Sequence, residues 1–271
     1  MAHTVSFIAD DFGLHPEIDQ GIIELAKRGR IHGVSVLITS QNFSAERFRE
    51  LISTNVRVGV HLAFTETTPI NKNSLPAPWT TPSGSFVPHW KTLARLLLTT
   101  PLPVPLVTGE FRSQILALRE LGGSIDYVDS HQNIHLLPQF FPAIDPLITE
   151  GTIPKLRMYR DPPRLSRPLF SLINLLGRRY STRLPTLDTF GLFASCNLDQ
   201  SKLSDILSIG GKADQDFFVL THPGKTARLS PAAAVYYPPY ELRWRQEFEL
   251  LNGARLMELL DLHGLQIAPV G

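Results

Sequence analysis

The chain has 271 residues, of which 43% are hydrophobic and 19% charged, and its 26 Lys and Arg side chains nearly balance 25 Asp and Glu side chains. The near-zero net charge excludes a surface that binds polyanions by bulk charge, and the hydrophobic content excludes intrinsic disorder. A single cysteine, Cys196, excludes an intramolecular disulfide framework and a metal-thiolate cluster. Nine histidines beside this one cysteine are the unusual feature of the composition.

Short apolar segments rich in β-formers alternate along the chain with segments of helical periodicity. Strands are predicted at residues 4–9, 34–39, 56–62, 125–129, 153–158, 217–220 and 265–270. Helices are predicted at residues 18–26, 45–52, 109–121 and 140–149. Apolar strands that alternate with helices favour a parallel sheet covered on both faces. Seven or eight such units predict an α/β fold of the (βα) barrel type, irregular or seven-stranded.

No low-complexity linker divides the chain, so we expect one barrel-like domain over residues 1–271 with a Pro-rich loop insertion at about 69–105. So long a loop predicts a substrate lid or the contact of a homodimer. We recognise no signal peptide and no apolar run of membrane-spanning length, which favours a cytoplasmic protein. The charge balance predicts no nucleic-acid partner. A basic tract from Lys155 to Arg183 suits a solvated face or a phosphate-binding or membrane-binding surface.

Polar residues at the carboxyl ends of parallel strands point into one shared crevice. Four of the predicted strands end in carboxylates or imidazoles, and these residues are Asp10 and Asp11, His61, Asp129 with His131 and His135, and His222. Taken singly, each has an ordinary structural interpretation. The aspartates suit a helix N-cap, His61 a hydrogen-bonded core residue and His222 a turn.

The segment from Asp129 to His135 is the more specific signal, because several ionisable groups at a buried strand end are costly without a metal or a pairing network. Carboxylate and neutral imidazole suit Zn²⁺ and other divalent transition ions, and we expect one aspartate and two histidines as ligands. Asp10 and Asp11 repel one another, so one can bind the metal while its neighbour handles protons. His222 then suits the proton donor that a water-activating metal site needs.

Four motifs resemble, in their order and spacing, the YdjC-like carbohydrate deacetylases, which include chitooligosaccharide deacetylase and the hopanoid-associated deacetylases. The motifs are Ala9-Asp10-Asp11-Phe12-Gly13, Gly59-Val60-His61-Leu62, Asp129-Ser130-His131 through His135-Leu136-Leu137-Pro138, and His222-Pro223-Gly224. The resemblance runs from Ser6 to about Gly224. It implies a metal-dependent hydrolase on a (βα)-barrel-like fold that removes the acetyl group of an N-acetylated sugar.

Carried over position by position, the resemblance places Asp11, His61 and His131 at metal-binding positions. It makes Asp10 the general base and His222 the general acid. The cofactor that it implies is a divalent ion, Mg²⁺ or Zn²⁺, and the partner is the N-acetylated sugar itself.

Four further residues are expected beside these groups, as substrate contacts or as supports for the metal ligands. Arg157 falls where a basic residue often faces the active site. Asp129 is expected to hold His131 or His135 by a hydrogen bond. Asn133 departs from the family, which commonly has histidine there, and we expect it to alter pocket polarity or substrate choice.

Alternative functions remain open at this point. Asn133 is compatible with a barrel that has lost catalysis and binds carbohydrate, although such a binder needs no proton donor. A metal-dependent phosphoesterase is a second alternative, to which the basic tract would contribute. In the loop insertion, Trp79, Phe86 and Trp90 suit either stacking on a sugar ring or packing of the loop onto the barrel. The acetylated sugar itself, whether a soluble oligosaccharide, a lipid-linked sugar or an antibiotic precursor, is not identified.

Overall fold

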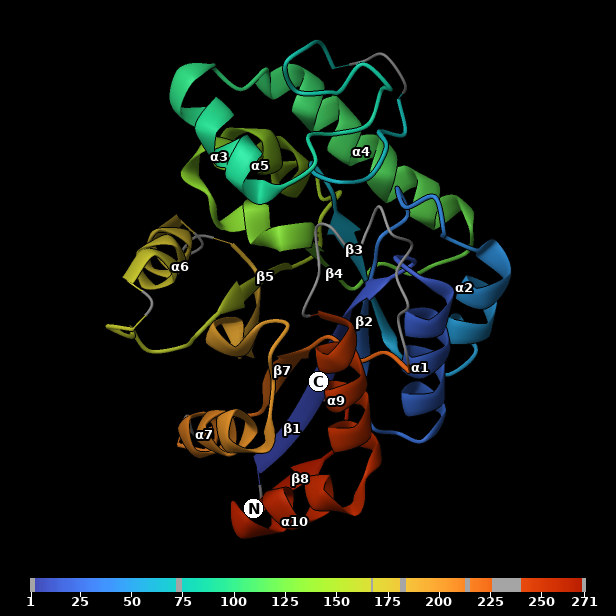
Figure 1. Ribbon diagram of the computed structural model, residues 1–271, viewed down its shortest axis with the longest axis vertical. Coiled ribbons are helices and arrows are strands. Elements are labelled where there is room, and N and C mark those ends of the chain that lie inside the picture. The colour runs from blue at the N-terminus through green and yellow to red at the C-terminus, as the bar shows by residue number, and fades with distance from the viewer. Residues whose placement is uncertain are drawn as a thin grey trace.

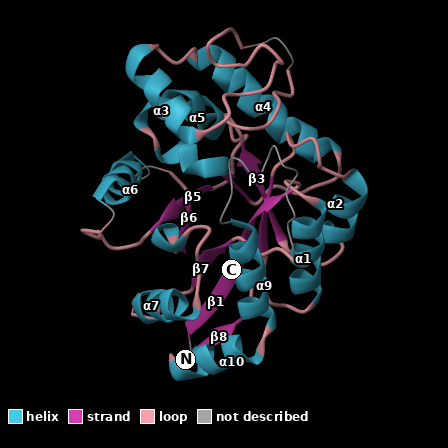
Figure 2. Cartoon of the chain, in the orientation of Figure 1, coloured by secondary structure: helices cyan, strands magenta, loops and turns pink. Residues whose placement is uncertain are grey.

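Parallel strands in the centre and helices around them build the molecule (Figures 1 and 2). The structure, a computed structural model, describes residues 3–71, 75–166, 168–180, 184–212, 215–225 and 240–269. The strands are β1 (His3–Phe12), β2 (Gly33–Val36), β3 (Arg57–Leu62), β4 (Tyr127–Ser130), β5 (Leu156–Tyr159), β6 (Thr186–Phe190), β7 (Phe217–Thr221) and β8 (Leu265–Ile267).

Helices follow most of the strands. The α-helices are α1 (Pro16–Lys27), α2 (Ala45–Ile52), α3 (Trp90–Thr99), α4 (Val104–Glu120), α5 (Phe141–Thr149), α6 (Pro168–Tyr180), α7 (Gln200–Gly210), α9 (Tyr240–Asn252) and α10 (Ala254–Leu262). Shorter helical turns are η1 (His131–Leu136), η2 (Pro138–Phe140) and η4 (Leu192–Ala194). None of the helices in the described part of the chain is both long and apolar enough to cross a membrane.

The sheet closes on itself through β1. The strand order is β2-β3-β4-β5-β6-β7-β1-β8, and β1 also pairs with β2. The first residues of β1 pair with β8, whereas Ile8 to Phe12 pair with β2, so one strand serves both neighbours along the same edge. The result is a closed barrel of seven parallel strands with β8 outside the ring. The predicted (βα) barrel-like α/β fold is confirmed.

Two apolar clusters follow from the alternation of side chains along each strand. The larger cluster includes Val5, Phe7 and Ala9 of β1 and packs the outer face of the barrel against the helices. The smaller cluster lies on the other face and consists of Ile8, Tyr127, Leu187 and Phe218. Because the period is two residues, the next residues on that face are Asp10 after Ile8 and Asp129 after Tyr127. Inside the barrel, the smaller apolar cluster therefore lies directly beneath a layer of polar side chains.

The main difference from the sequence prediction lies in the segment 69–105. It contains helix α3, which begins after His89, whose ring Nδ1 accepts a hydrogen bond from the Lys91 backbone N–H at 3.0 Å. Trp79 and Phe86 are buried against Phe64, which favours the packing role over sugar stacking. Strand β6 and helices α6, α7, α9 and α10 were not predicted. The last predicted strand ends at Ile267, and Val270 lies outside the described residues.

Gly59 is required by the interior of the barrel. A Cβ atom at this position of β3 would lie 2.2 Å from the ring of Tyr127, its neighbour across the pairing with β4. We expect Gly59→Ala to lower the free energy of unfolding by roughly 2–3 kcal/mol through overpacking. The matched control is Gly109→Ala in α4, where nothing lies within 4 Å of the added carbon and helix propensity predicts a gain of up to about 1 kcal/mol. Denaturant unfolding of both variants measures the difference, and equal stabilities would contradict the interpretation.

Candidate functional site

Asp10 and Asp11 both enter the barrel mouth because β1 is irregular at this point. Adjacent residues of a regular strand point to opposite faces. The pairing of β1 with β2 shifts register between Ala9 and Phe12, and Asp11 has a φ of 68°, in the left-handed region. An irregularity of this kind re-aims a side chain, so that two consecutive carboxylates can serve one site.

Asp10 and Asp129 are held by one buried guanidinium. Nη1 and Nη2 of Arg157 donate to the two carboxylate oxygens of Asp10 at 2.5 and 2.6 Å, and Nη1 lies 2.8 Å from Oδ2 of Asp129. All three side chains are at most 2% exposed. Burial opposes ionisation, but Arg157 and His61 outweigh it and lower the pKa of Asp129 to about 2. Arg157 therefore lies behind Asp10 as its support.

His61 lies between Asp129 and Asp11 and contacts both. It pairs in register with Asp129 across β3 and β4, and its Nδ1 lies 2.7 Å from Oδ1 of Asp129. Its Nε2 lies 3.4 Å from Oδ1 of Asp11. Burial disfavours the charged ring, but Asp129, Asp10 and Asp11 raise the pKa of His61 to about 9. The expectation that Asp129 holds His131 or His135 is thus wrong, because the register of β3 and β4 places His61 opposite it.

His131 completes the cluster from the start of η1. Its Nδ1 lies 3.0 Å from Oδ1 of Asp11, and its Nε2 lies 2.9 Å from Oε2 of Glu66. Burial again opposes the charged form, but Asp11 and Glu66 raise the pKa of this ring to about 10. Two buried histidines thus take up protons because they face carboxylates.

The residues predicted as metal ligands fit a divalent cation. Asp11, His61 and His131 each offer one ligand atom, and these atoms lie within 4.8 Å of one another. A carboxylate and two imidazoles are donors suited to Zn²⁺ and other divalent transition ions. A cation bound here would neutralise the negative charge of the carboxylates. Without a cation, the protonated rings of His61 and His131 do so. The geometry brings the three residues together, and their role as ligands remains a prediction.

His222 lies at the edge of this cluster, at the end of β7. Its Nε2 is 3.9 Å from Oδ2 of Asp10, and its Nδ1 accepts a hydrogen bond from the Cys196 backbone N–H at 3.3 Å. Burial lowers the pKa of the ring. The backbone N–H of His222 donates to Oε2 of Glu247 at 2.6 Å, which fixes the end of the strand. The neutral ring therefore carries its proton on Nε2, on the side of Asp10.

Asn133 and His135 have different surroundings. Oδ1 of Asn133 accepts a hydrogen bond from the Tyr159 hydroxyl at 2.7 Å, and Nη2 of Arg157 donates to the oxygen of that hydroxyl at 2.9 Å. His135 is buried between the Ser130 hydroxyl and the backbone carbonyl of Arg157, and burial lowers its pKa to about 4. Asn133 thus lies at the end of a hydrogen-bonded chain from Asp10, whereas His135 braces the turn after β4.

Backbone strain is concentrated around these groups. Of the non-glycine residues with positive φ in the described part of the chain, all but Asn55 belong to this region, and they are Asp11, Glu66, Gln132, Asn133 and Cys196. Such conformations cost of order 1 kcal/mol or more each and persist where the surrounding structure imposes them. Their clustering is typical of a functional site.

Several residues of the site were not found from the sequence. Glu66 follows His61 by five residues in a loop, and only the fold shows that it meets His131. Tyr159 lies two residues after Arg157, so strand alternation places both on one face. Glu247 comes from α9, far along the chain, and no motif marks it.

A cavity of about 540 Å³ opens above the cluster. Asp10, Asp11, His61, His131 and His222 contribute to its lining, and so does Asn133. Arg157, Asp129 and His135 are not among its lining residues, which agrees with their place behind the site. Of the three loop aromatics, Trp90 lines the cavity and is 39% exposed.

Comparison of the sequence with known protein families identifies the family to which this chain belongs. The family described as YdjC-like protein matches residues 4–262. The chain belongs to the YdjC-like family. The resemblance shown by the four strand-end motifs is therefore confirmed at the level of the family, and it extends past Gly224 through α9 and α10.

One curated relative and two solved structures are similar to this YdjC-like chain. The chitooligosaccharide deacetylase of Proteus mirabilis (strain HI4320) is 25% identical over 236 residues, which is 82% of either chain. A structure from Enterococcus faecalis V583, named as that of a proposed cellobiose-phosphate cleavage protein, has 21% identity and a TM-score of 0.73, covering 99% of this chain and 98% of its own. The lactam utilization protein from Thermus thermophilus has 13% identity and a TM-score of 0.50, covering 97% and 98%. These two structures show a shared fold.

Removal of the buried guanidinium tests its role as the support of the site. We expect Arg157→Met to lower the free energy of unfolding of the metal-free protein by roughly 3–5 kcal/mol, because Asp10 and Asp129 lose their buried cation. The matched control is Arg160→Met, since Arg160 is partly exposed in a surface pair with Asp188 and should cost less than about 1 kcal/mol. Urea unfolding at neutral pH measures both, and a loss at Arg157 no larger than at Arg160 would contradict the assignment.

Proposed function

We propose that this YdjC-like protein is a metal-dependent hydrolase that removes the N-acetyl group from an N-acetylated sugar. The observation that carries the proposal is the meeting of Asp11, His61 and His131 in one buried cluster at the floor of a cavity. Asp10 and His222 lie beside the cluster, as a base and an acid would. The name of the Proteus mirabilis relative supports the choice of a deacetylase.

Hydrolysis of an acetamide needs an activated water, a proton acceptor and a proton donor. When bound by Asp11, His61 and His131, a Mg²⁺ or Zn²⁺ ion supplies a Lewis acid that polarises the carbonyl and lowers the pKa of water. Asp10 accepts the proton from the water that attacks the acetyl carbon. Arg157 holds both oxygens of Asp10, yet each oxygen retains a second lone pair for that proton.

His222 serves the leaving group. Its Nε2–H lies on the side of Asp10, because the Cys196 backbone N–H occupies Nδ1. To act as the general acid, the ring must first gain a second proton. The imidazolium then gives its Nε2 proton to the sugar nitrogen as the C–N bond breaks and returns to the neutral ring, and the products are acetate and the free amine. Asp129 keeps His61 oriented through Nδ1, so that Nε2 of that ring is directed to Asp11.

The alternatives gain less support from the described residues. A protein that only binds carbohydrate has no use for Asp10 and His222 on the two sides of a cation site. For a phosphoesterase, the basic tract would have to offer its charge to the cavity. Arg157 of that tract is engaged by Asp10 and Asp129 and does not line the cavity. Arg160 pairs with Asp188, and Arg164 lies over the ring of Phe193. Arg167 and Arg183 of that tract lie outside the described residues.

The Asp10→Asn variant distinguishes the proposed role of a base from that of a metal ligand. We expect this variant to release acetate from N-acetylglucosamine oligomers with a kcat at least about 1,000-fold lower, because it cannot take the proton of water. Its metal content should stay near that of the wild type, because Asp10 is not one of the three predicted ligands. Acetate assays and elemental analysis of the same samples measure both quantities.

The control for this experiment is Asp205→Asn, which changes a carboxylate that is 59% exposed on α7. It should retain activity and metal. Full activity of Asp10→Asn would overturn its role as base. Wild-type protein that releases no acetate from a broad panel of N-acetylated sugars would overturn the proposed function.

A further inference from the structure

The cavity above the metal-ligand cluster continues as a groove with apolar walls. Helix α3 contributes Leu93 and Leu97 to one wall, and α6 contributes Leu169, Leu172 and Leu176 to the other. Figure 1 shows these two helices on the same side of the barrel. The groove is therefore continuous with the site at Asp10 and His222, which line the same cavity.

The outer part of the groove presents aliphatic side chains to solvent. Leu98 is 82% exposed, and Leu169 and Leu172 are each 53% exposed. Scattered exposed leucines are ordinary, but a contiguous set around a hollow marks a place where something apolar binds. Because this set adjoins the catalytic end of the cavity, the occupant is expected to reach both.

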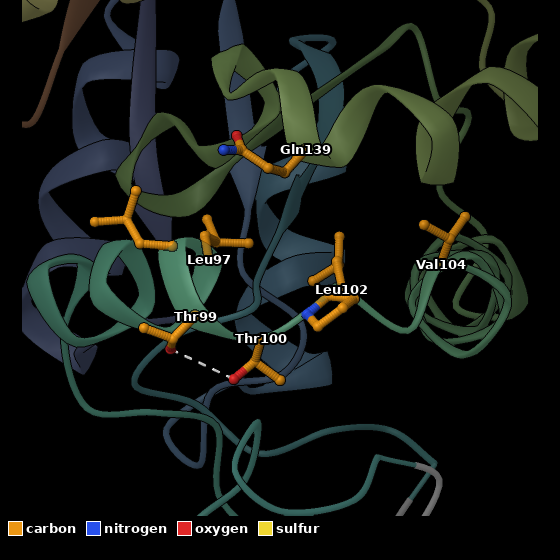
Figure 3. Close-up of a pocket in the computed structure, with 8 residues that line it drawn as sticks. Leu97, Thr99, Thr100, Leu102, Val104 and Gln139 are labelled. Atoms are coloured by element: carbon orange, nitrogen blue, oxygen red, sulfur yellow. Dashed lines mark hydrogen bonds between the residues drawn. The ribbon is translucent and has the colours of Figure 1, made fainter.

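A second hollow of about 410 Å³ extends the groove beyond the end of α3. It shares Leu97, Leu98 and Gln139 with the first cavity and adds Leu102 and Val104. Figure 3 shows Leu97 of α3 and Gln139 of η2 on facing sides of this hollow. Thr99 and Thr100 also line this hollow, so the groove continues past the end of α3 with walls that are partly apolar and partly polar.

The chemistry of the walls distinguishes between kinds of substrate. A soluble oligosaccharide needs hydrogen-bonding side chains at each sugar unit and aromatic faces for its rings. The described parts of α3 and α6 offer the groove mainly leucine, isoleucine and alanine, with Trp90 and Phe170 as its aromatic residues. Aliphatic walls suit an alkyl chain, which gains free energy in proportion to the apolar area that leaves water.

We propose that the groove binds the alkyl part of a glycolipid, so that the substrate is an N-acetylated sugar carried on a lipid. The inference rests on the proposed deacetylase function. The sugar lies at Asp10 and His222, and the tail runs between α3 and α6 toward the open outer end.

The test compares methyl, butyl and octyl β-glycosides of N-acetylglucosamine at concentrations below micelle formation, with acetate release as the readout. Each methylene that enters the groove fully should raise kcat/KM by roughly four-fold. The octyl glycoside should therefore exceed the methyl glycoside by at least about 100-fold, mainly through a lower KM. Equal kcat/KM values for the series would overturn the inference.

Variants locate the effect in the groove. Leu172→Gln and Leu176→Gln should each lower the ratio of octyl to methyl kcat/KM by about ten-fold, because a polar amide replaces part of the wall. The matched control is Leu262→Gln on α10, a leucine that is 74% exposed and is not among the lining residues. A ratio unchanged by both groove variants would overturn the inference.

A binding readout separates this inference from the proposed function. Trp90 and Trp244 line the cavity, so tryptophan fluorescence should change on titration with the octyl glycoside and not with the methyl glycoside. Binding of the octyl glycoside without acetate release from any substrate would overturn the proposed deacetylase function and support the proposed role of the groove.

Faster release of octanoate from the N-octanoyl methyl glycoside than of acetate from the octyl glycoside would assign the groove to the acyl group and overturn the inference. Loss of a dimer on Leu172→Gln, together with no dependence on chain length, would assign it to a second copy and overturn the inference.

Discussion

The site depends on how a closed barrel accommodates several buried carboxylates at one end. Asp10, Asp11 and Asp129 are each at most 5% exposed, and isolated charges at such positions would be strongly destabilising. Arg157 on β5 compensates the charges of Asp10 on β1 and of Asp129 on β4 through direct ion pairs. These pairs join strands that the closure of the barrel brings around one interior. Asp11 faces two imidazoles instead of a fixed cation. That asymmetry divides the cluster into a half in which Arg157 holds Asp10 and Asp129, and a half around Asp11 that offers carboxylate and imidazole atoms suited to a divalent ion.

The sequence predicts the barrel and its strand-end residues because both depend on local patterns. Apolar strands show where the carboxyl ends fall, and the ionisable residues from Asp129 to His135 stand out there because their burial is costly, whereas Asp10, His61 and His222 gain weight only in combination. The irregularity of β1 at Asp11 was not predictable, since it depends on how β1 is shared between β2 and β8. Nor was the register that sets His61 opposite Asp129, because pairing between strands far apart in sequence leaves no local signal. The helix inside the Pro-rich segment was missed because prolines around it concealed a short amphipathic stretch.

The same architecture explains why ionisable side chains and leucines line one cavity. The strands deliver ionisable groups to the barrel mouth, whereas α3 and α6 rise beside it with leucines that the barrel core does not cover. Asn133 lines the same cavity, has a positive φ, and is hydrogen-bonded through Tyr159 to the guanidinium that holds Asp10. A substrate with a polar sugar and an apolar tail matches this division, since each part meets side chains of its own polarity.

The central claim is that the half of the cluster around Asp11 binds a divalent ion. The most direct measurement is anomalous diffraction at the zinc edge from crystals of the protein grown with Zn²⁺. The account predicts one strong peak within coordination distance, about 2.0–2.2 Å, of Asp11, His61 and His131, with Asp10 still paired to Arg157. A fully occupied zinc elsewhere in the chain, with His61 and His131 still hydrogen-bonded to carboxylates as described, would contradict it.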